Sequence, residues 1–310
     1  MQKIIIAFIL VAIVGCQKPS FRQKFGWKAE DYFIDSKVVE LCHAIEKKDL
    51  AKIDKLIAEG ADVNAKGQGN MTPLLWAYPE NNLDVFTKIL EHGADPNVQF
   101  TSDFNTKMNI EPGSSVIELA AGTWFPGYFK AVMEHGGNPN LVSKGRFGNT
   151  LLHSVIQGYA VDKKENLKLL IDAGADLNLL CGAGRPPLAQ AVSWGGQYDL
   201  AIQLVEAGAD WELMYGPDKT TVLHLILDEN EGRLPVSKAP AHIKASYDKL
   251  VDILKAKGAD FEEAKRDQEL YRKYSGFSPE IIKKEREKII KYRMERYEKK
   301  RAAKEEEKRG

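Results

Sequence analysis

The sequence predicts an all-α protein: a solenoid of about six helix-turn-helix units with short β-fingers, followed by a long charged C-terminal helix. One observation is a five-residue phrase, Gly-Ala-Asp-x-Asn, which recurs with small changes at 33, 43, 38, 34 and 50 residue intervals. Self-similarity at such periods marks stacked units that bury their apolar faces against their neighbours. The other observation is the tail, residues 263–310, where 17 Lys and Arg accompany 11 Asp and Glu. The phrase begins at Gly60, Gly93, Gly136, Gly174, Gly208 and Gly258.

The first fifteen residues differ in kind from the rest. Lys3 precedes an unbroken apolar run over 4–14, which is too short to span a membrane but has the length of a signal-peptide core. The run leads into the motif Ile-Val-Gly-Cys, which resembles the lipobox of bacterial lipoproteins. This resemblance implies a signal peptide over 1–15 and lipidation of Cys16. Gln17 favours an outer membrane lipoprotein that faces the periplasm. The alternative is a secreted protein with an accidental cysteine.

Residues 16–36 are expected to form a tether between the lipid and the array. Aromatic rings in such a segment suit the interface of a bilayer, and they also suit a cap on the first unit. The sequence leaves both alternatives open. The aromatic residues are Phe21, Phe25, Trp27, Tyr32 and Phe33.

The array is predicted over residues 37–262, and its second unit shows the pattern best. Thr72 is placed to cap a helix, and Pro73 suits the first helical position because its missing N–H costs nothing there. A second, apolar helix ends at Gly93, a residue type that adopts the left-handed turn after a helix. Asp95 and Asn97 then supply turn chemistry for the next β-finger.

This pattern resembles the ankyrin repeat, which opens on Thr-Pro-Leu-His and closes on Gly-Ala-Asp. Residues 37–64 lack the opening and suit an N-terminal cap. The resemblance implies an ankyrin-repeat solenoid. It also implies that His153 and His224, at the family's histidine position, bond backbone groups of the adjacent turn. The remaining units open with related tetrapeptides at Ser115, Thr150, Pro186 and Thr221.

Two cysteines remain in the array, and both are expected to be free. Cys42 and Cys181 lie three units apart. Helices stacked about 8–10 Å apart would keep them beyond the ~7 Å Cα separation that a disulfide allows.

The sequence contains no motif for covalent chemistry. G-x-S-x-G, P-loop and H-E-x-x-H patterns are all missing. We therefore expect a binding protein and not an enzyme, with no catalytic residue, no cofactor and no metal site.

The predicted contact residues are aromatic or basic side chains on first helices, fingers and two insertions, 98–112 and 230–242. Tryptophan is over-represented in interface hot spots, and insertions in repeat arrays often lie on the binding face. The alternatives are that the tryptophans fill gaps between units and that the basic finger is only solvated. The set is Trp76, Phe100, Phe104, Trp124, Phe125, Lys144, Arg146, Phe147, Arg185 and Trp194.

The tail, 263–310, is predicted to be a charged helical extension. Pro279 suits a first helical position, and alternating charges support a helix after it. We expect its first turns to dock on the last repeat and the remainder to project into solvent. Basic helices bind nucleic acid or anionic membranes, but an exported chain argues against nucleic acid. A monomer is expected.

Ankyrin lipoproteins of this size resemble the immunity proteins encoded beside type VI secretion phospholipase effectors. The resemblance implies that the chain, held on the membrane through Cys16, binds and neutralises a lipase or phospholipase effector. The alternative function is an envelope scaffold or a stress-tolerance ankyrin lipoprotein without a toxin partner.

Overall fold

The computed structural model describes residues 24–104, 110–231, 236–273 and 279–307. Cys16 and Phe21 lie outside these ranges. The chain divides into two compact units, Met1–Val116 and Ile117–Gly310. Over the described residues the secondary structure is helical, and three isolated antiparallel bridges take the place of strands. No helix in this part of the chain is long and apolar enough to cross a membrane. The predicted all-α fold class is confirmed.

The first unit consists of paired helices in two layers. The inner helices pack on each other, and each also packs on the outer helix that follows it in the sequence. The predicted cap on the second unit's helix is confirmed, because Thr72 Oγ1 accepts a hydrogen bond from the Leu75 N–H at 3.1 Å. The elements are α3 (Ala29–Tyr32), the inner helices α4 (Ser36–Lys47) and α6 (Pro73–Ala77), the outer helices α5 (Leu50–Ala58) and α7 (Leu83–Glu91), and the short 3₁₀ turns η1 (Gln68–Asn70) and η2 (Tyr78–Glu80).

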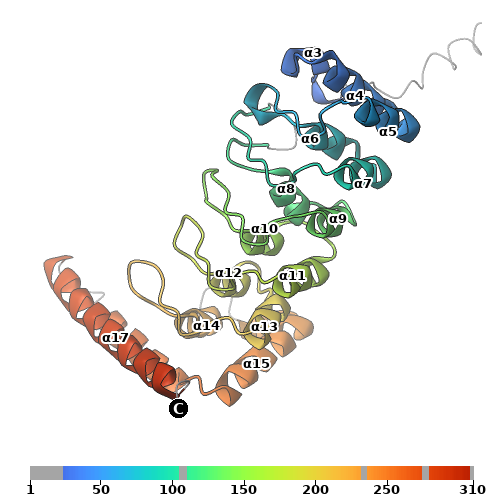
Figure 1. Cartoon of the computed structure of the whole chain (residues 1–310). Helices are drawn as coiled ribbons and strands as arrows, with labels where there is room; N and C mark the ends of the chain where they lie inside the picture. The colour runs from blue at the N-terminus through green and yellow to red at the C-terminus, as the bar shows by residue number, and fades with distance from the viewer. Residues whose placement is uncertain (1–23, 105–109, 232–235, 274–278, 308–310) are drawn as a thin grey trace, which may run out of the picture. The chain divides into compact units, whose positions relative to one another are not determined.

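The second unit repeats the same two layers (Figure 1). Its inner helices are α8 (Val116–Gly122), which begins on the last residue of the first unit, α10 (Leu151–Gln157), α12 (Pro187–Ser193), α14 (Val222–Glu231) and α16 (Phe261–Lys273). Its outer helices are α9 (Tyr128–Glu134), α11 (Lys163–Asp172), α13 (Tyr198–Glu206) and α15 (Ala241–Ala256), preceded by η3 (Val236–Lys238). Helix α17 (Pro279–Glu307) follows.

Helix stacking continues beyond residue 262. Helix α16 packs on α14 as the earlier inner helices pack on one another. It begins within the sixth copy of the repeated phrase, where the Asp260 carboxylate caps it by accepting a hydrogen bond from the Glu263 N–H at 2.8 Å. The start of the tail is thus an additional inner helix of the stack.

The repeated phrase connects successive units through its last residue. In the fourth unit, Asn178 Oδ1 accepts a hydrogen bond from the Asp210 N–H at 2.9 Å. Asn140 does the same for the Asp176 N–H at 2.7 Å, and Asn64 for the Asp95 N–H at 2.8 Å. The asparagine of one copy therefore fixes the turn of the next, and we call this series of bonds the asparagine ladder.

The aromatic residues of the N-terminal segment cap the first unit. Trp27 is 2% exposed, and its ring centroid lies 5.5 Å from that of Trp76 and 6.1 Å from that of Phe104. The indole N–H of Trp27 donates to the Phe104 carbonyl at 3.3 Å. Phe33 is also buried against Trp76. Of the two alternatives that the sequence left open, the described rings form a cap on the first unit.

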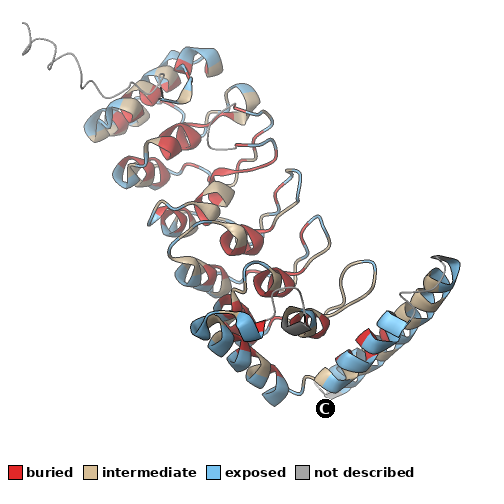
Figure 2. Cartoon of the chain, turned by 180° about the vertical axis from the view of Figure 1, so that it is seen from behind, coloured by how far each residue is buried: buried red, intermediate tan, exposed pale blue. Residues whose placement is uncertain are grey.

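This packing corrects three predicted contact residues. Trp76, Phe100 and Phe104 are 0%, 2% and 5% exposed, so their side chains fill the core of the first unit and offer no surface to a partner. The physical reason is the N-terminal segment, which covers the inner helix that carries Trp76. The insertion also turns its rings inward, because its backbone returns at Phe100, whose N–H donates to the Ser114 carbonyl at 2.8 Å. The buried residues appear red in Figure 2.

Both histidines at the family position are structural, as predicted. His153 is fully buried, with Nε2 donating to the Arg185 carbonyl of the next finger at 3.0 Å and Nδ1 bonded to the Thr150 hydroxyl at 2.8 Å. His224 accepts from the Thr221 N–H at 3.2 Å. Its Nε2 lies 3.6 Å from the carboxylate of Asp267, a residue of α16.

The prediction of two free cysteines is confirmed. Cys42 and Cys181 are both reduced and buried. Burial raises the pKa of the Cys42 thiol well above its ordinary value, with smaller contributions from Glu46 and Glu30, so the neutral thiol is favoured there.

The expectation for the C-terminal helix is wrong in one respect. Its first turns do not make its main contacts: Ile281 is 44% exposed. Contacts with the repeats run from Arg286, paired with Asp218, to Lys304, paired with Glu212. The middle and later turns of α17 therefore dock, because the basic side chains that match the acidic residues of the last repeat lie there.

Candidate functional site

The exposed side chains of the second unit gather along two edges of its inner helices. Each inner helix starts at a finger and ends at a loop that leads to its outer helix, so fingers and loops lie at opposite ends of the same helices (Figure 1). Helices α10 and α12 have seven residues each, which separates the two edges by about 10 Å. The face between them is the candidate partner-binding surface.

The first edge is the basic finger strip, made of Lys144, Arg146, Phe147 and Arg185. Phe147 is 60% exposed, and the Arg146 guanidinium lies 5.6 Å from its ring centroid, which is within cation–π distance. The two fingers touch, since the Gly182 N–H donates to the Phe147 carbonyl at 3.0 Å. Lys144 is exposed.

Arg185 is less available to a partner than the other members of the strip. It is half-buried, and its Nη1 donates to the Ser193 hydroxyl at 2.8 Å. Its carbonyl accepts the hydrogen bond from His153. Arg185 therefore ties its finger to the end of α12, and its guanidinium already has a partner within the chain.

The second edge carries a row of exposed apolar residues, which we call the aromatic rim. Trp124 follows α8 and is 69% exposed, Tyr159 and Val161 follow α10 and are 82% and 79% exposed, and Trp194 follows α12 and is 50% exposed. The rim places one exposed aromatic residue after each of three successive inner helices. Phe125 is half-buried and rests on Tyr128, with 5.4 Å between ring centroids.

Hydrogen bonds lock the rim loops to one another. The Tyr159 N–H donates to the Gly122 carbonyl at 2.9 Å, so the loops that hold Trp124 and Tyr159 are joined through their backbones. Gln197 Nε2 donates to the carbonyls of Ile156, at 2.8 Å, and Trp194, at 2.9 Å. The loop of Trp194 is thus fixed to the end of α10.

Lys163 adds a charged bond to this lock. Its ammonium donates to the Ile156 carbonyl at 2.8 Å and to Gln197 Oε1 at 3.0 Å. Burial lowers the pKa of Lys163. The Lys163 side chain therefore holds the rim loops together, and few of its N–H donors remain for a ligand.

An open cavity of about 480 Å³ adjoins the rim at the starts of α11, α13 and α15. Val161 and Gly195 line it beside the rim, and the buried Tyr198 and the half-buried Ile243 line it as well. A hollow of this size beside exposed aromatic rings can receive an apolar side chain from a partner.

Two rim residues, Tyr159 and Val161, were not singled out in the sequence. The available signal was position: both follow the end of an inner helix, as Trp124 and Trp194 do. The structure brings Trp124 and Trp194 onto the rim and groups the four strip residues on neighbouring fingers.

The described residues contain no group of three or more His, Cys, Asp or Glu side chains arranged to hold a metal ion. The two edges carry aromatic rings and basic groups, which suit recognition of another surface.

The sequence model of the ankyrin repeat family matches residues 69–99. A putative ankyrin repeat protein of Fowlpox virus is 29% identical over 165 residues, which cover 52% of this chain and 20% of that protein. The chain spans between a fifth and a quarter of the length of the curated relatives it matches.

Solved structures show the same fold. An ankyrin repeat domain from Acinetobacter baumannii AYE superposes with a TM-score of 0.52 at 20% identity, over 69% of this chain and 97% of that one. A Bdellovibrio bacteriovorus structure, predatory endopeptidase Bd0816 with immunity protein Bd3460, matches at 20% identity over 70% and 97% of the chains, with a TM-score of 0.48 that is too low to bear on function. Together with the two helix layers, the match over residues 69–99 and the Acinetobacter structure show that the chain has the fold of an ankyrin-repeat solenoid.

Proposed function

We propose that this chain is a lipid-anchored periplasmic protein that binds another protein across the inner-helix face of its second unit and thereby neutralises it. The observation that carries the proposal is the aromatic rim. Three exposed aromatic residues, Trp124, Tyr159 and Trp194, repeat along one edge. Side chains of this kind dominate binding energy at interfaces when they become buried.

The rigidity of the rim also supports the proposed binding. Its loops are joined by backbone and side-chain hydrogen bonds, so little conformational entropy is lost when a partner docks. The basic finger strip at the opposite edge favours a partner with exposed carboxylates near its apolar contact residues.

The proposed partner is a secreted phospholipase effector. The resemblance to ankyrin lipoproteins encoded beside such effectors supports this choice, and so does the lipobox-like motif at Cys16, which would keep the chain where an incoming toxin arrives. Inhibition needs only that the rigid face covers the mouth of the effector's active site.

The test is co-purification of the mature chain with the candidate effector, together with survival of cells that receive the effector. A triple variant, Trp124→Ala, Tyr159→Ala and Trp194→Ala, should lose at least about 100-fold in affinity, because hot-spot truncations each cost about 2 kcal/mol or more. It should lose protection in parallel. Arg146→Glu should weaken binding through the finger strip.

The matched control is Leu83→Ala, which removes an exposed apolar side chain (39%) from α7, outside both edges. It should bind and protect like the unchanged protein. No complex with the effector and no protection by the unchanged chain would refute the immunity role. Full binding by the triple variant would refute the proposed surface.

A further inference from the structure

Helix α17 buries charge where a docked helix ordinarily buries an apolar stripe. Among its described side chains, only Arg293 is fully buried, at 4% exposure, while Ile281, Tyr292 and Met294 are 40% exposed or more. Figure 2 shows most of the helix as exposed or intermediate. The side that faces the repeats is mostly basic and carries, beside Tyr297, the residues Arg286, Arg293, Arg296, Lys300 and Lys304.

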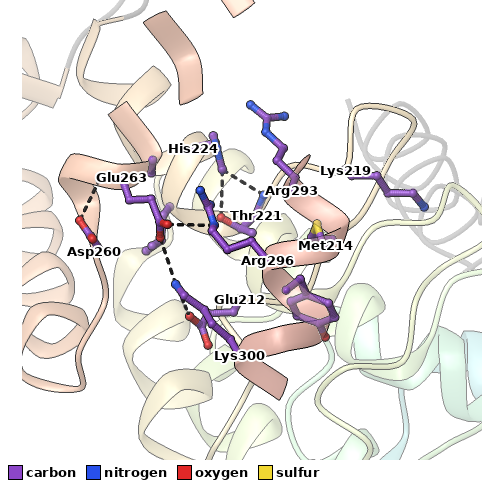
Figure 3. Close-up of a pocket in the computed structure, with 13 residues that line it drawn as sticks. Glu212, Met214, Lys219, Thr221, His224, Asp260, Glu263, Arg293, Arg296 and Lys300 are labelled. Atoms are coloured by element: carbon purple, nitrogen blue, oxygen red, sulfur yellow. Dashed lines mark hydrogen bonds and ion pairs between the residues drawn. The ribbon is translucent and has the colours of Figure 1, made fainter. Parts of the chain in front are cut away.

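The surface beneath α17 is acidic. Arg296 Nε lies 2.9 Å from Glu263, and Lys300 Nζ lies 3.0 Å from Glu263 and 3.3 Å from Glu212. Figure 3 shows these side chains converging from α16, from the residues before the sixth finger and from α17. Two further pairs, Arg286 with Asp218 and Lys304 with Glu212, extend the contact toward either end of the helix.

The centre of this contact is incompletely satisfied. Asp267 is 2% exposed and lies 3.5 Å from Arg293 Nε and 3.2 Å from Arg296 Nη2. The Nε of Arg293 and the Nε2 of His224 are buried without a hydrogen bond. A cavity of about 40 Å³ borders them. Buried ion pairs with imperfect bonding carry a desolvation cost that is recovered when the charges return to water.

The repeated phrase has a different last residue in the copy that contacts α17. The asparagine that fixes the next turn in earlier copies is replaced by Glu212 in the fifth copy, and Glu212 pairs with Lys300 and Lys304. The asparagine ladder therefore ends at Asp210, and a charged contact with α17 takes its place.

We propose that α17 is a detachable arm that ion pairs hold on the last repeat. The docked arm covers the acidic surface formed by Glu212, Asp218, Glu263 and Asp267, and release of the arm exposes this surface. Release is driven by weakening of the ion pairs, since the buried Arg293 is charged and the other basic side chains of the contact pair with acidic groups of the repeats. This device does not depend on the identity of the partner proposed above.

The experiment measures the position of α17 directly in the full mature chain held in detergent. Spin labels at Glu206→Cys, at the end of α13, and Lys299→Cys, on α17, occupy exposed positions. Cys42 and Cys181 are buried and stay unlabelled. Raising NaCl from about 0.1 M to about 1 M shortens the Debye length from about 10 Å to about 3 Å. We expect the narrow distance distribution of the docked arm to give way to a broad one.

Charge variants separate the proposed contact from a general salt effect. Asp218→Arg should increase the released population at about 0.1 M NaCl by about tenfold, the effect of roughly 1.4 kcal/mol. The double variant Asp218→Arg with Arg286→Asp should restore docking. Lys291→Glu is the matched control, because Lys291 is 78% exposed and pairs with Glu295 of its own helix.

A distance distribution that stays unchanged at about 1 M NaCl would overturn the proposal, because an arm held by charge must respond to screening. Equal release by Lys291→Glu would overturn it as well, since that residue does not face the repeats. Circular dichroism of each sample checks that the array remains folded, and the salt titration of the otherwise unchanged chain needs no charge variant.

Discussion

His153 shows how a single side chain joins two repeats and makes stability depend on pH. Burial is the main reason that the pKa of this imidazole falls from 6.5 to about 4, and the nearby Arg185 charge adds to the decrease. The neutral ring accepts from Thr150 and donates to the Arg185 carbonyl. Protonation would place a proton on Nδ1 and a charge in the core.

The first prediction concerns this histidine. Above about pH 6.5 the ring is neutral in both the folded and the unfolded chain, and its stabilising contribution is complete. Between pH 6.5 and about 4 the unfolded chain binds a proton that the folded chain does not, so stability should fall by up to about 3 kcal/mol. Denaturant unfolding over this pH range measures the loss.

His153→Gln is the matched variant, because its amide can still donate to the Arg185 carbonyl but does not titrate. The slope of stability against pH over this range should be shallower in the variant. Equal slopes in the two proteins would contradict the assignment.

At the scale of elements, the rim loops fit together because glycine sits at their contact. A Cβ built on Gly158 would lie 2.4 Å from the Gly122 Cα and 2.7 Å from the Ser154 carbonyl oxygen. Both obstacles are backbone, so neither can move aside cheaply. A Cβ on Gly122 would meet its nearest atoms at 3.5 and 3.8 Å, which is ordinary contact.

The second prediction follows from this asymmetry. Gly158→Ala should destabilise the protein by about 1–3 kcal/mol, as overpacking does. It should also weaken partner binding, because it displaces the loop of Tyr159. Gly122→Ala should change stability by less than about 0.5 kcal/mol. Thermal unfolding and the binding assay above distinguish the two, and equal effects of both variants would argue against a tight loop contact.

The elements of the array were predictable from the sequence, because capping residues and the repeated phrase act locally. Thr72 caps its helix as expected. The fate of Trp76 and Phe104 was not predictable, since it depends on the segment around Trp27 returning over an inner helix more than forty residues later in the chain. Long-range packing of that kind has no local signal.

The candidate site was also predictable only in part. Trp124 and Trp194 were singled out by residue type and lie exposed on the rim. Tyr159 was not predicted, because its position after an inner helix, and not its residue type, marks it as a rim residue. The sequence predicts Arg185 as a contact residue, but its bond to Ser193 depends on how the finger folds onto α12.

At the scale of the whole molecule, the proposed function requires the chain to stay at a membrane. The described residues contain no helix able to span one. The proposed anchor is a covalent lipid on Cys16, which the lipobox-like motif implies. Two or three acyl chains are sufficient for stable attachment, whereas a single chain gives only marginal binding.

The third prediction tests this anchor. The unchanged chain should fractionate with outer membranes and incorporate labelled palmitate. Cys16→Ala should incorporate none and should leave the membrane fraction. Cys42→Ala, at a buried cysteine of the array, is the control and should remain attached. Labelling that persists in Cys16→Ala would contradict the lipobox interpretation.

The asparagine ladder also constrains how such an array can grow during evolution. A duplicated repeat inserted between the fourth and fifth units would meet Asn178 on one side and the Gly-Ala-Asp turn at Gly208 on the other, so its bonds are supplied in advance. A repeat appended after the sixth phrase would find Glu262 in the asparagine position and α16 already stacked on α14. Duplication within the array preserves its bonding, whereas extension at its C-terminal end requires new residues.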